Sequence, residues 1–286
     1  MIAGGQHVIK RVARRSEYRF WCLGDIHWGH AGCHEKEVKR TIARIEEDPR
    51  AYWWGMGDYW DLVTWGDKRF DPAGIAKEHR AAHFQGLAKD MLEFGYELLK
   101  PIKKKCLGML EGNHEWKYNV AIRGGDAPLV NDLCEALSTK SYKVPFLGYS
   151  AFKDVVFADI IKVRWYIHHG AGSAQTKGGK LNRLLRFVNS RDADIIAMGH
   201  VHALMDDIKP VLAANDNCTD ITALNKLSLL TGSYLKGFNH DESGSSSYVE
   251  RAGFEPCAIG SPCVVYCPGL ETVAVEKPVG RLGRSV

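Results

Sequence analysis

No stretch of the 286-residue sequence is apolar for long enough to cross a bilayer as a helix, so we expect no membrane-spanning segment. Residues 1–19 include basic side chains but no apolar core, so we expect no secretory signal there. The eight cysteines include no C-x-x-C pair, and several of them lie within apolar stretches. These absences argue against a disulfide scaffold and a structural zinc site, and they favour a reducing, cytoplasmic location. The net charge of +4 permits an anionic substrate without requiring one.

The composition is that of a globular protein with a substantial core. Hydrophobic residues make up 45% of the chain and charged residues 25%, which is enough apolar material for one large domain at this length. Because no internal repeat or linker interrupts the chain, we expect a single domain over residues 1–286. Its last part, residues 203–286, is predicted to be mainly β and to contain a glycine- and serine-rich loop at 239–248.

Strands and helices are predicted to alternate along the chain. In the first half, short apolar runs favour strands and apolar residues at helical spacing favour helices, in the order 19–24 (strand), 35–47 (helix), 52–55 (strand), 73–99 (helix) and 105–110 (strand). The second half is predicted to hold a helix over 179–189 and strands at 160–167, 194–198, 204–208, 227–231, 264–266 and 272–275. This alternation indicates an α/β fold with a largely parallel sheet covered by helices.

Five short motifs rich in histidine and aspartate each follow one of these apolar runs. In chain order they are Asp25-Ile26-His27, Gly57-Asp58-Tyr59-Trp60-Asp61, Gly112-Asn113-His114-Glu115, His168-His169-Gly170 and Gly199-His200-Val201-His202. Ligands of open α/β sheets gather beyond the carboxyl ends of the strands. Carboxylate, imidazole and amide groups delivered to that edge are what a site for two divalent metal ions needs. A single motif of this kind would be a weak signal, whereas five in order predict a binuclear metal site.

In these motifs the chain resembles the calcineurin-like metallophosphoesterase superfamily, whose pattern is D-x-H, G-D-x-x-D, G-N-H-[ED], H-G and G-H-x-H. The resemblance covers residues 22–202, about two-thirds of the chain. It implies a four-layer α/β/β/α sandwich of two central sheets. It also implies a hydrolase in which a hydroxide that bridges two metal ions attacks a phosphoester.

The resemblance also implies roles for individual residues. The metal ligands would be Asp25, His27 and His202 on the first ion, Asn113, His169 and His200 on the second, and Asp58 on both. His114 would face the phosphate without binding metal, and Asp61 would orient it by a hydrogen bond. We prefer His169 over His168 because the family ligand directly precedes the glycine. Manganese suits carboxylate, imidazole and amide ligands best, and zinc, iron and magnesium are the alternatives.

The motifs favour phosphodiesters as substrates. Serine/threonine protein phosphatases of this family carry Asp-Arg-Gly at the second motif, whereas Leu62 and Val63 follow Asp61 here. The paired histidines of the last motif resemble the phosphodiesterase and Mre11/SbcD-type nuclease branches, and the compact chain resembles calcineurin-like proteins of bacteriophages. We therefore predict a phosphodiesterase, with DNA as the leading substrate. A phosphomonoesterase acting on a nucleotide or small phosphate, and a non-catalytic scaffold, are the alternatives.

Substrate contacts are less specified than metal ligands. His30 lies on the loop after the first motif, and Lys180 and Arg183 lie on the predicted helix after the fourth motif, so we predict that these three touch the substrate. The alternative for each is a solvated side chain on a loop or a helix face. Aromatic residues near the motifs could stack on nucleobases or pack the loops against the scaffold: Trp28, Tyr59, Trp60, Trp65, Trp116 and Tyr118. We expect no membrane partner, and a homodimer is compatible with the sequence.

Overall fold

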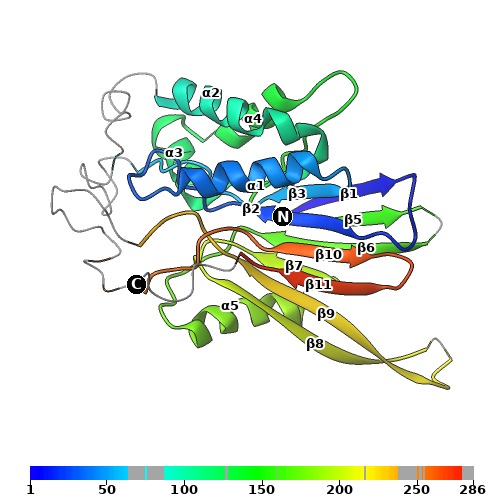
Figure 1. Ribbon diagram of the computed structural model, residues 1–286. Coiled ribbons are helices and arrows are strands. Elements are labelled where there is room, and N and C mark those ends of the chain that lie inside the picture. The colour runs from blue at the N-terminus through cyan, green and yellow to red at the C-terminus, as the bar shows by residue number, and fades with distance from the viewer. Residues whose placement is uncertain are drawn as a thin grey trace, which may run out of the picture.

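Two β-sheets packed face to face form the centre of the molecule (Figure 1). The computed structural model describes residues 1–63, 75, 87–125, 128–158, 160–215, 217–237, 250, 253 and 255–278. The first sheet has six strands in the order β1 (Ile2–Ile9), β5 (Ser150–Phe157), β6 (Ile161–His168), β7 (Ile195–Met198), β9 (Ile221–Thr231) and β8 (Leu204–Ala214). The second has five, in the order β11 (Thr272–Glu276), β10 (Cys263–Cys267), β2 (Tyr18–Leu23), β3 (Ala51–Gly55) and β4 (Cys106–Met109).

Helices cover the outer face of each sheet. The second sheet lies beneath α1 (Glu35–Glu47), α2 (Leu87–Leu99), η3 (Lys100–Lys105), α3 (Asn113–Ile122) and α4 (Leu129–Leu137), and the first sheet lies above α5 (Lys177–Ser190) (Figure 1). The layers therefore run α/β/β/α, which confirms the predicted architecture.

Three layers of buried apolar side chains lie between the four structural layers. A single strand can contribute side chains to two of these apolar layers. On β3, Trp53 packs toward the helices while the next residue, Trp54, packs between the sheets. On β6, Trp165 lies between the sheets and Tyr166 faces α5. Successive side chains of a strand point to opposite faces, so a strand that is covered on both sides must be apolar throughout. This is why the strands read as continuous apolar runs.

The parallel strands bring the five motifs to one edge of the sandwich. Strands β2, β3 and β4 run parallel in the second sheet, and β6 and β7 run parallel in the first. The motifs follow the carboxyl ends of these five strands, one motif per strand. The fold thus delivers each candidate ligand from the end of a buried strand.

The structure corrects several predictions. The sheets are more mixed than we predicted, because β10 runs antiparallel to β2 and β6 antiparallel to β5. We missed β1, β5, α3 and α4, and β8 and β9 are eleven-residue strands where we predicted five. The outer halves of β8 and β9 are exposed and lack a continuous apolar signal. Of the helix predicted over 73–99, only Leu87–Leu99 lies in a described helix, and the loop predicted at 239–248 lies outside the described residues.

In the described residues, no helix is long and apolar enough to cross a membrane. All eight cysteines fall within the described residues, and each is a free thiol. Five of them are buried within the packed layers: Cys22, Cys106, Cys134, Cys263 and Cys267.

Candidate metal centre

The backbone is strained at five of the seven predicted metal ligands. Seven described residues other than glycine have a positive φ, and five of these are Asp25 (48°), His27 (52°), Asp58 (51°), His200 (70°) and His202 (47°). A left-handed backbone costs roughly 1–2 kcal/mol at a residue with a Cβ. Such strain persists where the surrounding structure enforces it, and it gathers at functional sites. The strand-end turns therefore hold these side chains in place against a local preference.

One group of side chains combines the first and last motifs. The Asp25, His27 and His202 side chains each offer one ligand atom, and all three atoms lie within 4.8 Å of one another. The Nε2 atom of His202 lies 3.3 Å from Asp25 Oδ1 and 3.1 Å from His27 Nε2. Two imidazole nitrogens and a carboxylate oxygen thus converge on one point.

A second group combines motifs two to five. The ligand atoms of Asp58, His169 and His200 also lie within 4.8 Å of one another. The His169 Nε2 atom lies 3.4 Å from Asp58 Oδ2 and 3.2 Å from Asn113 Oδ1. On the far side of the ring, His169 Nδ1 donates to the carbonyl of Met56 over 2.8 Å. This hydrogen bond leaves Nε2 deprotonated in the neutral tautomer and therefore able to bind a metal ion.

Asp58 lies between the two groups. Its Oδ2 atom is 3.4 Å from His169 Nε2 and 3.8 Å from His27 Nε2. Around an ion with ligand bonds of about 2.1 Å, neighbouring ligand atoms are about 3.0–3.4 Å apart in octahedral and tetrahedral geometry. Most of the separations at this site match that spacing. The residues present therefore fit divalent metal ions, and Asp58 is the carboxylate that lies close to histidines of both groups.

The charges of the site are coupled through the buried carboxylates. Burial favours the neutral form of Asp58, but the charges of His169 and His114 outweigh it and lower its pKa well below the usual range. Burial, and then the charge of His114, lowers the pKa of His27 to about 4, although Asp61 opposes this shift. Burial opposes protonation of His169 as well, yet the Asp58 carboxylate raises the pKa of His169 to about 9. In the metal-free protein at neutral pH, His169 is therefore protonated, and its positive charge faces the Asp58 carboxylate.

Metal binding at neutral pH should therefore release a proton. His169 is protonated below a pKa of about 9 and must lose that proton to bind metal. Apparent affinity should rise with pH up to about 9, by as much as tenfold per unit, and then level off. Titration calorimetry with Mn²⁺ in buffers of different ionisation enthalpy measures the number of protons released. A value near one at pH 7 is expected, and pH-independent binding between pH 6 and 9 would contradict the assignment of His169.

His114 and Asp61 lie beside the two groups. Oδ1 of Asp61 is 3.2 Å from His114 Nδ1 and 3.5 Å from His27 Nδ1. The His114 and His27 rings meet edge to face with their centres 4.7 Å apart. Burial opposes ionisation of Asp61, but its close contacts with these two histidines lower its pKa well below the usual range. Asp61 therefore lies against both imidazoles, whereas we predicted contact with His114 alone.

Glu115 is a structural residue of the site to which we assigned no role from sequence. Its fully buried carboxylate accepts four backbone hydrogen bonds, from Asp58 (3.0 Å), Tyr59 (2.6 Å), Trp60 (3.3 Å) and Gly112 (2.8 Å). It therefore ties the second motif to the third. Its place in the G-N-H-[ED] motif could have indicated this role, because a carboxylate at the third position of a helix often caps the backbone N–H groups of the N-terminus.

Gly112 is required at the same junction. A Cβ atom at Gly112 would lie 2.1 Å from Asp58 Oδ1, which is far inside van der Waals contact. Because glycine has no side chain, the backbone of the third motif can contact the Asp58 carboxylate. The backbone N–H of His114 donates to Asp58 Oδ1 over 3.0 Å. The motif glycine thus serves close packing of two motif loops.

Glu115→Ala should destabilise the protein strongly. The change leaves four buried N–H groups without an acceptor, and each unsatisfied group costs about 1–3 kcal/mol. We expect the free energy of unfolding, measured by urea denaturation of metal-free protein, to fall by several kcal/mol. Glu115→Gln keeps one acceptor oxygen and should lose less. An alanine variant as stable as the parent would show that these hydrogen bonds do not hold the two loops together.

The predicted substrate contacts and the alternative ligand lie around this centre. The half-buried ring of His30 accepts a hydrogen bond from Gly32 N over 2.8 Å, so one of its nitrogens closes its own loop. The His168 ring stacks on Phe187 at 4.6 Å and accepts from Gly170 N. The structure therefore turns His168 toward α5 and places His169 beside Asp58.

The two basic residues predicted to contact substrate differ in their surroundings. Arg183 donates from its guanidinium to the carbonyl of Ala171 over 3.1 Å. The next carbonyl, that of Gly172, lies 3.1 Å from His200 Nε2. Arg183 thus braces the loop that orients a candidate ligand, which sequence reasoning did not show. Lys180 is half-buried on the same helix.

Comparisons with known proteins give distant likenesses. No protein-family model matches the sequence, and no curated protein matches it significantly. A metallophosphoesterase structure from Sphaerobacter thermophilus is 12% identical, covers 92% of this chain and 90% of its own, and has a TM-score of 0.38. A conserved uncharacterized protein from Streptococcus pneumoniae TIGR4, described as a predicted phosphoesterase, is 10% identical over 87% of this chain and 83% of its own, with a TM-score of 0.32.

Proposed function

We propose that this protein is a phosphodiesterase that depends on two divalent metal ions and cleaves DNA. The observation that carries the proposal is the position of Asp58, whose Oδ2 atom lies close to histidines of both groups of ligand atoms. The first ion is assigned to Asp25, His27 and His202, the second to Asn113, His169 and His200, and both to Asp58. Manganese is the favoured ion.

The metal ions, when bound, neutralise charge on the phosphate and supply a nucleophile at neutral pH. In this proposal His114 faces the phosphate of the substrate and binds no metal ion. It stabilises the negative charge that develops on the phosphate or protonates the leaving oxygen. Asp61 holds the His114 ring by its 3.2 Å contact at Nδ1, so that Nε2 is the nitrogen presented to the substrate. The backbone of α3 begins at Asn113, and its N-terminus adds a partial positive charge beside a bound phosphate.

A panel of substrates tests the proposal. With manganese added, we compare single- and double-stranded DNA, RNA, bis(p-nitrophenyl) phosphate and p-nitrophenyl phosphate. Cleavage of DNA and of the small diester is expected. Hydrolysis of the monoester alone would replace this function with a phosphomonoesterase. No turnover of any substrate by protein that holds two ions would favour a scaffold.

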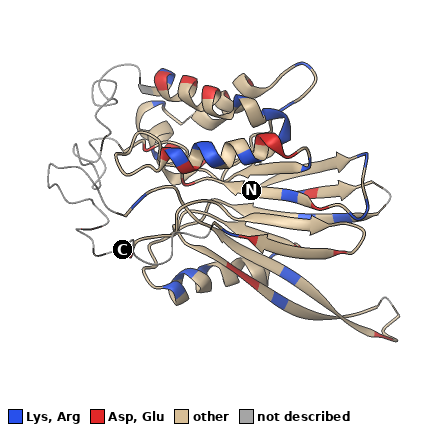
Figure 2. Cartoon of the chain, in the orientation of Figure 1, with Lys and Arg blue, Asp and Glu red and all other residues tan. Residues whose placement is uncertain are grey.

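DNA affinity should depend on salt and on the basic residues of α5, which are Lys177, Lys180, Arg183 and Arg186 (Figure 2). Reversal of Arg183 would also disturb the loop that it braces, so the test uses Lys177→Glu with Lys180→Glu. The pair should raise the Michaelis constant for DNA and reduce the slope of log affinity against log salt by about two, since each lysine contact contributes roughly one.

Hydrolysis of bis(p-nitrophenyl) phosphate by this double variant should stay near the parent rate, because a short ester does not reach the helix. The matched control is Lys140→Glu with Lys143→Glu. These exposed lysines flank Tyr142, whose hydroxyl donates to Cys106 at the amino end of β4, away from the motif edge. Equal effects of the two double variants on DNA would remove the support for α5 as a contact surface.

A further inference from the structure

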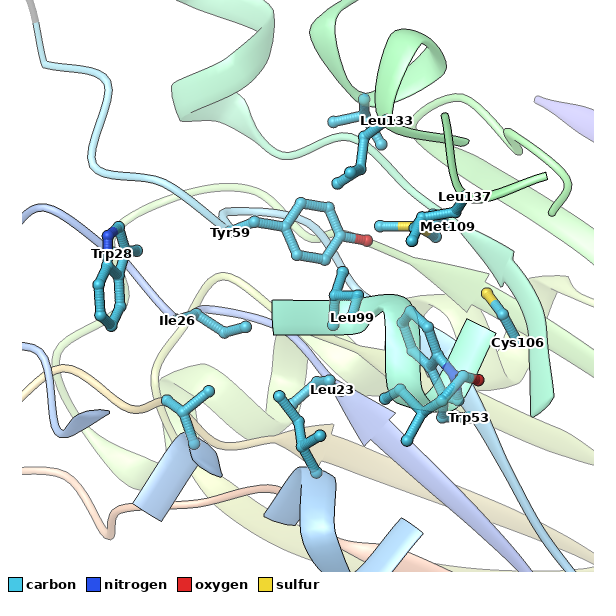
Figure 3. Packing of buried hydrophobic residues seen from close by; sticks show 14 of the residues in the cluster. Leu23, Ile26, Trp28, Trp53, Tyr59, Leu99, Cys106, Met109, Leu133 and Leu137 are labelled. Carbon is cyan, nitrogen blue, oxygen red and sulfur yellow. The ribbon is translucent and has the colours of Figure 1, made fainter. Parts of the chain in front are cut away.

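The aromatic residues near the motif loops separate into two classes in the structure. Trp28 is buried and stacks on Phe94 with ring centres 3.6 Å apart. Tyr59, Trp60 and Tyr118 are also buried. Figure 3 shows the Tyr59 ring directed into the cluster that contains Leu99, Met109 and Leu133. These four side chains pack the loops against the scaffold, and Trp65 lies outside the described residues.

Trp116 differs from this group because half of its surface is open to solvent. It is 51% exposed, although an indole ring is costly to leave in water. Val120, four residues further along the same helix, is 52% exposed. Residues four apart lie on the same face of a helix. Trp116 and Val120 therefore form a short apolar ridge on α3.

The ridge is continuous with the candidate site. Trp116 comes three residues after Asn113, and side chains three apart on a helix are neighbours about 5–6 Å apart at Cβ. Helical side chains lean toward the N-terminus and cover the preceding turn. We therefore expect the Trp116 ring to lie back over the turn that begins at Asn113, whose side chain lies 3.2 Å from His169. Asn113, His200 and His202 are only half-buried, so the site is partly open to solvent on the side where α3 begins.

We propose that Trp116 is the platform on which a nucleobase of the substrate stacks while the adjoining phosphate lies at the metal centre. The inference rests on the proposed function and names the substrate feature that the site reads. A flat, exposed indole one helical turn from the phosphate position matches the geometry of a nucleotide, whose base and phosphate are joined by one sugar. Base stacking on an aromatic ring tolerates any base, so this subsite favours nucleotides over simple phosphate esters without selecting a sequence.

Binding of two small probes tests the subsite without relying on turnover. Deoxyadenosine 5′-monophosphate and deoxyribose 5-phosphate share the phosphate and the sugar and differ only in the base. Titration calorimetry of the manganese-loaded protein gives the ratio of their dissociation constants. We expect the nucleotide to bind roughly tenfold or more tightly. Trp116→Ala should bring the ratio close to one, and Trp116→Phe should keep most of the preference.

Ile122→Ala is the matched control, because Ile122 is 55% exposed on the same helix but lies on another face. It should leave the ratio unchanged. A wild-type ratio near one, or a preference that survives in Trp116→Ala, would overturn the proposal. If instead the protein cleaves no diester but shows the ring-dependent ratio, then the proposed reaction fails while the subsite stands, so the two claims are separable.

Discussion

His114→Ala is expected to lower kcat for a phosphodiester by about 10²–10⁴-fold while the protein keeps its metal ions. The expectation follows from the contacts of His114, which meets Asp61 at 3.2 Å and lies edge to face against His27. Loss of a general acid leaves the leaving oxygen unprotonated, but no proposed metal ligand is removed. Steady-state kinetics together with metal analysis by mass spectrometry measure both quantities.

Two further results separate the roles of His114. Its ligand atom also groups with those of His27 and Asp58 within 4.8 Å, so a role as a metal ligand is the direct competitor. Loss of an ion in His114→Ala would show that His114 binds metal. Asp61→Asn should lower kcat in the same direction but by less, because it alters only the orientation and charge of the imidazole. Added imidazole should restore part of the activity of His114→Ala.

Asp58→Ala is expected to abolish metal binding at both positions and to reduce activity by about 10³-fold or more, since metal ions supply several kcal/mol of transition-state stabilisation. The Asp58 carboxylate is buried, and burial alone would raise its pKa. The charges of His169 and His114 outweigh this effect and hold the pKa well below the usual range. Removal of this charge leaves neighbouring histidines without a counter-charge. Metal content per chain and kcat with bis(p-nitrophenyl) phosphate are the measurements.

His168 and His169 supply a matched pair of controls for this prediction. His169→Ala should lose an ion, because His169 Nε2 faces Asp58 and Asn113. His168→Ala should keep both ions, because the His168 ring stacks on Phe187. Full metal content in Asp58→Ala, or the reverse behaviour of the two histidines, would contradict the assignment.

The site could be predicted from sequence because it depends on strand ends. A strand that is buried on both faces is a continuous apolar run, and β2, β3 and β7 show such runs directly before their motifs. Parallel neighbours then place the motifs at one edge. The order of the motifs therefore predicts that their side chains lie close together, although the sequence shows no long-range contact.

Other parts of the fold have no such local signal. The edge strand β1 contains Gly4, Gly5 and Gln6 and is mostly exposed, so its pairing with β5 depends on tertiary context. The four bonds to Glu115 and the brace from Arg183 to Ala171 were not predictable, because each depends on which backbone atoms the folded loops bring together. The sequence likewise could not tell the buried aromatic residues from Trp116.

Anomalous scattering from a manganese-loaded crystal should show directly whether Asp58 joins two metal ions. We expect two peaks about 3.5–4 Å apart, both within ligand distance of the Asp58 carboxylate. One peak should be bound by Asp25, His27 and His202, and the other by Asn113, His169 and His200. A single ion, or two ions of which only one touches Asp58, would contradict it.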